Sequence, residues 1–227
     1  MNSHTGSMGG EKAVWQAFSR QTGTVLVDNF EESLDTPAIF PHFSEGVGRR
    51  VAVVGGGGSV GVAASDACEQ VGLQIPTSPP YIQQQLRVLL PPAGTSISNP
   101  VDVGAPTLPP SVFQKVLEIL LSWDEIDALI IDRIFLYGTP QLIGMPGADS
   151  EKRAEVLLNI RKRVKKPLLA ILGELATNVD KIGMEIDRRQ VQDRFLQTGI
   201  AVSPSLQRAV KALSNVCSYY EKACTYK

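Results

Sequence analysis

From residue 51 onward, short apolar runs alternate with longer segments in which apolar residues recur at helical spacing. Five of the short runs are rich in aliphatic residues and bounded by glycine, proline or charged residues, which is typical of buried strands. These predicted strands cover residues 51–54, 73–76, 127–132, 167–172 and 199–202. Helical patterns occupy the segments that follow them: from Gly58 to Gly72, within 79–92, at 109–123, 151–164, about 186–197 and about 205–220.

Strands that alternate with helices predict a parallel sheet with helices on both faces. With about five strands, the pattern favours an α/β fold of the flavodoxin-like, doubly wound kind, preceded by a partial α/β segment. Ligands of such open sheets bind outside the carboxyl ends of the strands. Two connecting segments, 99–106 and 135–150, are rich in glycine and proline, and we expect both to be irregular. The length of the second is typical of a functional loop.

The first 50 residues begin with a helical pattern over residues 11–22, which Gly23 is placed to end. The apolar face of this predicted helix consists of Val14, Trp15 and Phe18. At the other end of the region, residues 41–50 lose all periodicity and are typical of a linker.

A short strand and a second helix are predicted between these two segments. The β-branched run TVLV, residues 24–27, indicates the strand. Asp28 or Asn29 can then cap a helix, because a short polar side chain accepts hydrogen bonds from the first helical amides. Pro37 should limit the length of that helix, since proline cannot donate the intrahelical hydrogen bond.

Composition and net charge argue against some classes of function. The formal net charge is −1, whereas a protein that binds the phosphate backbone of nucleic acid needs a basic surface. The longest apolar runs are far shorter than the roughly 20 residues of a membrane span, so we expect no membrane segment. Three cysteines without metal-ligand spacing and without a signal peptide fit a reducing cytoplasm, and hence a cytoplasmic protein: Cys68, Cys217 and Cys224.

The first candidate for chemistry is the glycine-rich turn Gly55–Gly61, between the first strand of the sheet and its helix. Without β-carbons the backbone can approach an oxyanion closely, and the first helical N–H groups carry partial positive charge. No Gly-Lys-Ser/Thr follows, so this is not a P-loop, and the dinucleotide fingerprint is degenerate. A tight crossover that needs small residues for packing explains the glycines equally well.

The second candidate is His4, one of only two histidines in the chain. Its imidazole has a pKa near 6.5 when unperturbed, which suits nucleophilic work at neutral pH. On spacing alone, a terminal histidine without function or part of an expression scar accounts for it better. A functional site at His4 is favoured by its small and hydroxyl-bearing neighbours: Ser3, Thr5, Gly6 and Ser7.

Other polar residues carry weaker indications. His42 lies in the predicted linker and is expected at the surface, and Asp102 is expected to cap a turn rather than to act in catalysis. The basic run 161–166 is expected to be a solvated helix end that complements the helix dipole. Glu174 follows a predicted strand and could be functional. The sequence shows no Ser/His/Asp set, no spaced carboxylate pair and no metal cluster.

Four stretches together resemble the acyl-CoA synthetases of the NDP-forming type, which are relatives of succinyl-CoA synthetase. Residues 3–35, beginning SHTGS, resemble the end of the histidine-bearing domain of that family. The stretches 49–67, 89–104 (with Asn-Pro-Val-Asp-Val) and 198–213 resemble its next, flavodoxin-like domain. The pattern of the family's first stretch is kept without a gap at Arg20, Gln21 and Gly23.

The resemblance implies that His4 is a transient phosphohistidine, with Thr5 and Gly6 beside it as phosphate contacts. It takes phosphate from an acyl phosphate and passes it to a nucleoside diphosphate, or the reverse. The family holds this group between two helix N-termini, and the second of these corresponds here to Gly57, Gly58, Ser59 and Val60. The chain departs from the family at Gly55 and Gly56, where Thr-Asn is common, so side-chain contacts to phosphate are lost there.

The resemblance also sets domain boundaries and partners. Residues 1–45 correspond to the C-terminal part of the histidine-bearing domain, and residues 46–227 to the flavodoxin-like domain. The CoA-binding and ATP-grasp domains of the family have no counterpart in the sequence, nor has the first half of the histidine domain. The chain is therefore expected to be a piece of a larger subunit or a split gene product. ATP or ADP with Mg²⁺, and CoA, should then bind through partner domains or subunits, and the chain could also form a homo-oligomer.

Two other functions remain open from the sequence. One is a non-catalytic assembly or regulatory module with the same fold, which the missing domains and the altered Gly55-Gly56 favour. The other is a flavin- or nucleotide-binding flavodoxin-like protein, against which the lack of a Ser/Thr-rich loop after the first strand argues.

Overall fold

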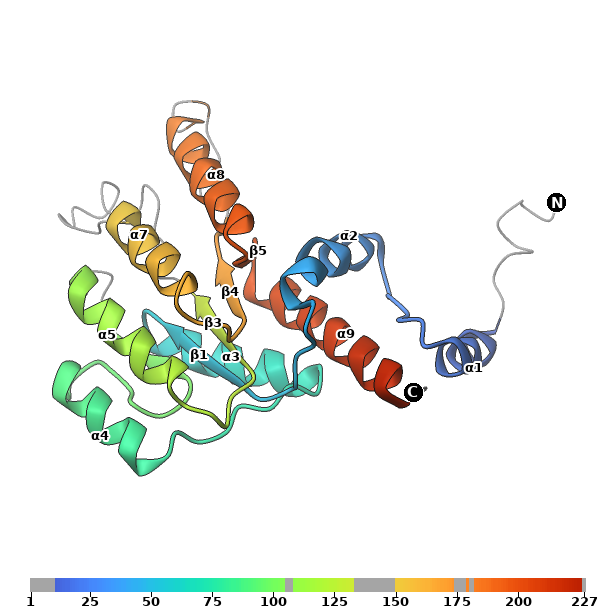
Figure 1. Ribbon diagram of the computed structural model, residues 1–227, viewed down its shortest axis with the longest axis horizontal. Helices are drawn as coiled ribbons and strands as arrows, with labels where there is room; N and C mark the ends of the chain where they lie inside the picture. Colours follow the sequence, from blue (N-terminus) through green and yellow to red (C-terminus); the bar gives the residue numbers. More distant parts are fainter. Residues whose placement is uncertain (1–10, 105–107, 133–149, 174–178, 180–181, 226–227) are drawn as a thin grey trace.

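A five-stranded, all-parallel sheet forms the centre of the computed structural model, which describes residues 11–104, 108–132, 150–173, 179 and 182–225 (Figure 1). Its strand order is β2-β1-β3-β4-β5, the order of flavodoxin-like sheets, so the predicted fold class is confirmed. The strands are β1 (Val51–Gly55), β2 (Val101–Asp102), β3 (Ala128–Asp132), β4 (Leu168–Ile171) and β5 (Ala201–Ser203).

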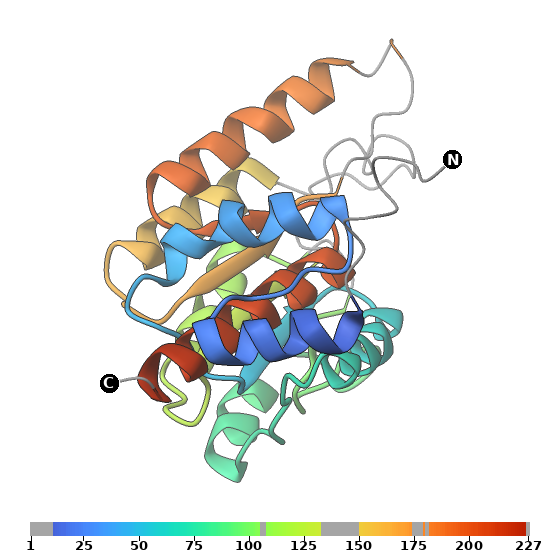
Figure 2. The same cartoon turned by 90° about the vertical axis from the view of Figure 1, so that its right-hand side faces the viewer.

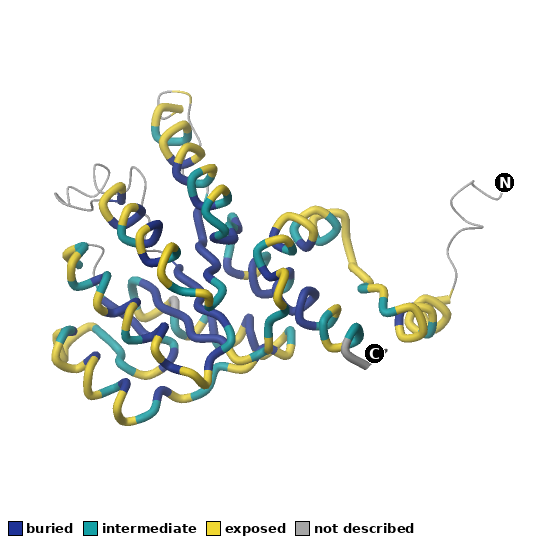
Figure 3. Tube along the Cα trace, in the orientation of Figure 1, coloured by how far each residue is buried: buried dark blue, intermediate teal, exposed yellow. Residues whose placement is uncertain are grey.

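Helices cover both faces of this sheet and divide the core into two layers. Successive residues of β1 point to opposite faces, so Val54 packs in one layer and Val53 in the other. One layer is covered by α4 (Pro80–Leu89), α5 (Pro110–Leu121), α7 (Ser150–Arg161) and α8 (Ile182–Gln197). The other is covered by α2 (Phe30–Ile39), the 3₁₀ helix η1 (Phe40–Phe43), α3 (Gly58–Gln70) and α9 (Leu206–Thr225). Figure 3 shows the buried strands between these two layers.

The second strand of the sheet is not the one that the sequence predicts. Within the predicted strand 73–76, only Gln74 makes a bridge, to Arg50, whereas β2 lies in the segment expected to be irregular. The reason is the buried side chain of Asn99. Its amide donates to Val51 O and accepts from Val53 N, both at 2.9 Å, so it occupies the edge of β1 before Val101 pairs with Val54.

The predicted strand at residues 24–27 is also wrong. These residues have no strand partner in the part of the chain that the structure describes, and Leu26 and Val27 are each 38% exposed. An apolar run becomes a strand only where a neighbouring backbone completes its hydrogen bonds. The helix α1 (Lys12–Thr22) that precedes this segment lies apart from the sheet in Figure 1, stands in front of the rest of the molecule in Figure 2, and is mostly exposed in Figure 3.

The segment that follows is anchored to the sheet layers rather than free. Asn29 caps α2 by accepting from the amide of Glu32, and α2 continues past Pro37 to Ile39. An ion pair joins Asp35 to Arg208 of α9 at 2.6 Å. The expected linker is wrong in its first part, because η1 buries Phe43 to 1% exposure against the core.

Candidate functional site

The glycine turn lies at the carboxyl edge of the sheet, at the point where the strand order reverses. β1 ends at Gly55, and α3 begins at Gly58. In the sheet register, Gly55 lies opposite Asp102 of β2 on one side and Asp132 of β3 on the other. The first strand, its turn and two buried carboxylates therefore meet at the position where ligands of doubly wound sheets bind.

The shape of the turn depends on Gly57, which precedes α3 with φ +103° and ψ 136°. Only glycine adopts such a conformation without strain, although the space around it is open: a Cβ at this position would meet no atom within 4 Å. Gly58 and Ser59, the first residues of α3, are exposed. A glycine N-cap has no side chain to accept from the first helical amides, so the start of α3 can offer its N–H groups to an outside acceptor.

Asp102 holds this turn in place. Its Oδ1 accepts hydrogen bonds from the backbone amides of Gly57 and Gly104, both at 2.8 Å. The side chain is buried, with 9% of Asp102 exposed. The expected turn cap is therefore present in the bond from Gly104. The bond from Gly57 was not predicted, because it joins residues far apart in the sequence.

A comparison with models of known protein families shows to which family the chain belongs. A model of the Ligase-CoA domain matches residues 51–198, which include β1 to β4 and run to the end of α8. The chain belongs to the Ligase-CoA domain family.

The curated relatives of this Ligase-CoA chain include several ADP-forming acyl-CoA ligases, which confirms the resemblance seen in the sequence. The alpha subunit of acetate–CoA ligase [ADP-forming] I of Pyrococcus furiosus is 27% identical over 93% of the chain, which spans 42% of that relative. The 4-hydroxybutyrate–CoA ligase [ADP-forming] of Nitrosopumilus maritimus is 28% identical over 78% of the chain and 24% of its own length.

Solved structures share the fold of the Ligase-CoA chain. A Pyrococcus horikoshii protein has a TM-score of 0.75 at 21% identity, covering 94% of this chain and 45% of its own. The dinucleotide-forming acetyl-coenzyme A synthetase 1 of Ca. Korarchaeum cryptofilum, in complex with phosphate and ADP, has a TM-score of 0.73 at 19% identity. That match covers 98% of this chain and 44% of the synthetase.

The predicted site residues fall into two groups. His4, Thr5 and Gly6 lie outside the described residues, as does Glu174. Gly57, Gly58, Ser59 and Val60 form the N-cap and first turn of α3, and of Val60 only the backbone is described. The assignment of phosphate contacts to these residues stays a prediction. Sequence analysis missed Asp132, which could have been found as the carboxylate that directly ends the buried run 128–131.

The basic run 161–166 lies near the ends of helices, as expected, but Arg161 and Lys166 are only partly exposed to solvent. Arg161 donates to Val164 O at 3.0 Å after the end of α7. Lys166 donates to Leu121 O at 3.2 Å, a carbonyl in the last turn of α5. These cations complement the partial negative charge of helix C-termini.

His42 is half-buried rather than fully at the surface. It lines a polar pocket of about 300 Å³ together with Arg161 and Lys165. Burial, and then the positive charge of Arg161, hold the pKa of His42 below its usual value, so the imidazole is neutral at pH 7. The pocket contains no residue of the glycine turn.

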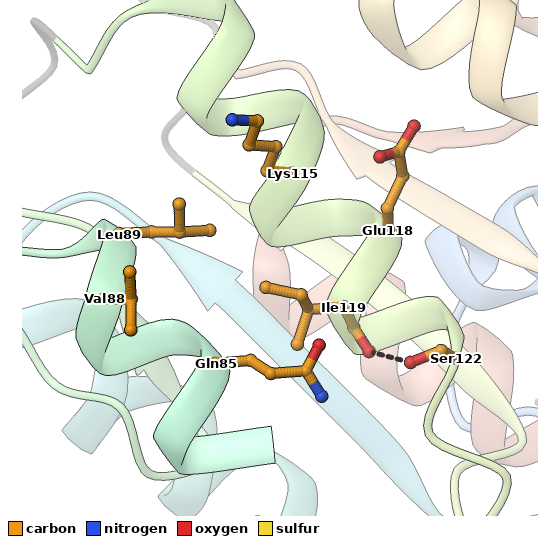
Figure 4. Close-up of a pocket in the computed structure, with 7 residues that line it drawn as sticks. All are labelled: Gln85, Val88, Leu89, Lys115, Glu118, Ile119 and Ser122. Carbon is orange, nitrogen blue, oxygen red and sulfur yellow. Dashed lines mark hydrogen bonds between the residues drawn. The ribbon is translucent and has the colours of Figure 1, made fainter. Parts of the chain in front are cut away.

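A larger groove of about 530 Å³ lies between α4 and α5 (Figure 4). Figure 4 shows the side chains of both helices around it, among them Val88, Leu89 and Ile119. Like the pocket at His42, it includes none of the predicted phosphate contacts.

Proposed function

We propose that this chain is the phosphate-relaying part of an NDP-forming acyl-CoA synthetase. Its relatives are ADP-forming acyl-CoA ligases, including the alpha subunit of such an enzyme. One observation carries the proposal: a helix N-terminus with glycine as its N-cap, Gly57, and an exposed glycine as its first residue, Gly58, at the reversal point of the sheet. A similar structure, that of the Ca. Korarchaeum cryptofilum synthetase, was solved in complex with phosphate and ADP.

In the proposed reaction, the neutral imidazole of His4 attacks the phosphorus of an acyl phosphate. A nitrogen–phosphorus bond forms as the phosphorus–oxygen bond to the acyl group breaks, and the carboxylate leaves with the bonding electrons. The phosphoryl group then moves from His4 to a nucleoside diphosphate, which releases neutral imidazole again. The whole sequence also runs in reverse.

The first turn of α3 would stabilise the phosphoryl oxygens in this transfer. A helix N-terminus carries about half a positive charge, and its free amides point at the ligand. Hydrogen bonds to a charged group contribute about 1.5–3 kcal/mol each. In phosphoryl transfer, such positioning and charge stabilisation supply most of the catalysis, since charge spreads over the equatorial oxygens.

CoA, and ATP or ADP with Mg²⁺, would be bound by partner domains, namely a CoA-binding domain and an ATP-grasp domain. The chain spans only 42% of the Pyrococcus furiosus relative. It also exposes an apolar face that a partner could cover: Val14, Trp15 and Phe18 of α1 are 62%, 49% and 48% exposed. Phe30, at the start of α2, is also exposed, at 75%.

The proposed function is tested by assembling the chain with an ATP-grasp subunit and a CoA-binding subunit and measuring acyl-CoA-dependent formation of ATP from ADP and phosphate. We expect activity that His4→Ala abolishes. His42→Ala is the matched control, because it removes the other histidine, away from the glycine turn, and should leave the rate unchanged. Activity that survives in His4→Ala would contradict the relay.

The same exposed apolar face favours the second candidate, an assembly module without catalysis. In that case the partners would still bind to α1, but His4→Ala would change neither the assembly of the complex nor the rate at which the complex forms ATP.

A further inference from the structure

Asp102 places a buried carboxylate directly against the proposed phosphate-binding turn. One of its oxygens, Oδ1, accepts from Gly57 and Gly104, whereas Oδ2 takes no hydrogen bond from the residues that the structure describes. Oδ2 faces the start of α3, because a Cβ built on Gly58 would lie 3.7 Å from it. The carboxylate thus shapes the turn with one oxygen and presents its other oxygen to the first residue of the helix.

This arrangement has two opposite effects on an anion at the turn. The bond to Gly57 fixes the backbone, which lets the next amides keep one direction when phosphate arrives. It also uses the amide of Gly57, so that an anion is left with the amides that begin at Gly58. The negative charge of Asp102 offsets the partial positive charge of the helix N-terminus and repels a dianion.

We propose that Asp102 is a positioning residue for the glycine turn and that its charge weakens the turn's hold on dianionic phosphate. The inference rests on the proposed function, because a phosphate carrier must release the group that it binds. Without the charge of Asp102, the turn would bind phosphate or phosphohistidine more tightly. The transfer of the phosphoryl group from His4 to a nucleoside diphosphate would then be slower. Asp102 therefore keeps the turn ordered and at the same time lowers its affinity for phosphate, so that phosphate can be released.

The variant Asp102→Asn separates the two effects. Asparagine keeps an oxygen that can accept from Gly57 and Gly104 but removes the charge. We would titrate the full chain with inorganic phosphate and follow the backbone amides of Gly57, Gly58 and Ser59 by NMR. We expect Asp102→Asn to bind phosphate at least tenfold more tightly than wild type, with the difference shrinking as salt is added.

Asp127→Asn is the matched control for this titration. It removes the same charge next to the start of β3, at the opposite edge of the sheet, where Asp127 pairs with Arg50. A strand of five residues is about 16 Å long, which exceeds the screening length of about 8 Å at physiological salt. Phosphate affinity in Asp127→Asn should therefore equal that of wild type.

A second variant, Asp102→Ala, tests the positioning role alone. It removes the acceptor, so hydrogen exchange at the amides of Gly57 and Gly104 should accelerate, while Asp102→Asn keeps them protected. If Asp102→Ala does not fold, protection in Asp102→Asn decides this point by itself.

The inference is overturned if Asp102→Asn binds phosphate no more tightly than wild type, shows no saturable shift, or loses protection at Gly57. The proposed function fails by a different observation, since an assembled enzyme that never phosphorylates His4 would refute it even if Asp102→Asn bound phosphate tightly.

Discussion

The side chain of Asn99 offers the sharpest test of how the site is built, because it decides where the second strand lies. Its Oδ1 accepts from Val53 N at 2.9 Å, and its Nδ2 donates to Val51 O at 2.9 Å and to Pro76 O at 3.0 Å. Asn99 is only 9% exposed, so water does not readily replace it. Truncation by Asn99→Ala would leave three backbone groups without a partner.

The cost of this truncation follows from those three groups. Leaving a buried donor or acceptor unsatisfied costs about 1–3 kcal/mol. At the low end of that range for each group, we predict that Asn99→Ala lowers the free energy of unfolding by about 3 kcal/mol. With a urea slope of about 2 kcal/mol per molar, the midpoint should fall by about 1.5 M in equilibrium unfolding followed by circular dichroism.

Asn215→Ala is the matched control for Asn99→Ala. Asn215 is similarly buried, at 8% exposed, but among the described residues its side chain makes one hydrogen bond, to Thr36 Oγ1 at 3.0 Å. We expect this variant to lose about 1 kcal/mol. Equal losses in the two variants would refute the reasoning, because the predicted difference comes entirely from the backbone groups that Asn99 holds at the edge of β1.

Three further predictions test other parts of the structure. Gly57→Ala should lose about 1–3 kcal/mol of stability in urea unfolding, because its φ of +103° strains any other residue, and an unchanged midpoint would contradict this. The hydrogen bond from Arg188 holds the pKa of Glu185 below its usual value, so this pair stabilises the fold above the unfolded carboxyl pKa and loses its effect as the pH falls through the folded one. The stability difference between wild type and Glu185→Gln should therefore shrink from about pH 6 to about pH 3, and a constant difference would argue against the pair. Burial raises the pKa of Cys68 and Cys217 to about 12, so both thiols should resist a maleimide at pH 8 until urea unfolds the chain, as mapped by mass spectrometry; rapid native labelling would contradict their burial.

Much of the fold was predictable because the strands of this sheet are buried on both faces. The runs around β1, β3 and β4 are continuously apolar, and helical spacing marks the segments between them. The two errors in the prediction of strands have a common cause. TVLV at residues 24–27 has strand composition without a neighbour, whereas Val101–Asp102 pairs with β1 although its surroundings are rich in glycine and proline. Pairing depends on contacts between distant residues, which composition does not report.

The candidate site was predictable only in part for the same reason. The glycine turn could be predicted from its composition. Its position after the first strand of the sheet follows from the pattern of apolar and polar residues. The hydrogen bond from the amide of Gly57 to Asp102 could not be predicted from the sequence, since it depends on β2 lying beside β1. Asp132 reaches the same edge by the register of β3.

The described residues contain no helix long and apolar enough to cross a membrane. The cytoplasmic location that the cysteine pattern favours stays a prediction. The boundary between a histidine-bearing segment and a flavodoxin-like domain near residue 45 also stays a prediction. In the structure, Ile39 and Phe43 of the first segment belong to the same core as Val51 and Val53 of the second.

The most direct test of the central claim is to look for phosphohistidine on His4. The chain would be assembled with its ATP-grasp and CoA-binding partners, incubated with ATP labelled at the γ-phosphate, and analysed by mass spectrometry without acid treatment. We predict an acid-labile phosphate on His4 that disappears on addition of ADP and is absent from His4→Ala. An assembled and folded complex that turns over acyl-CoA without ever carrying phosphate on His4 would contradict the relay.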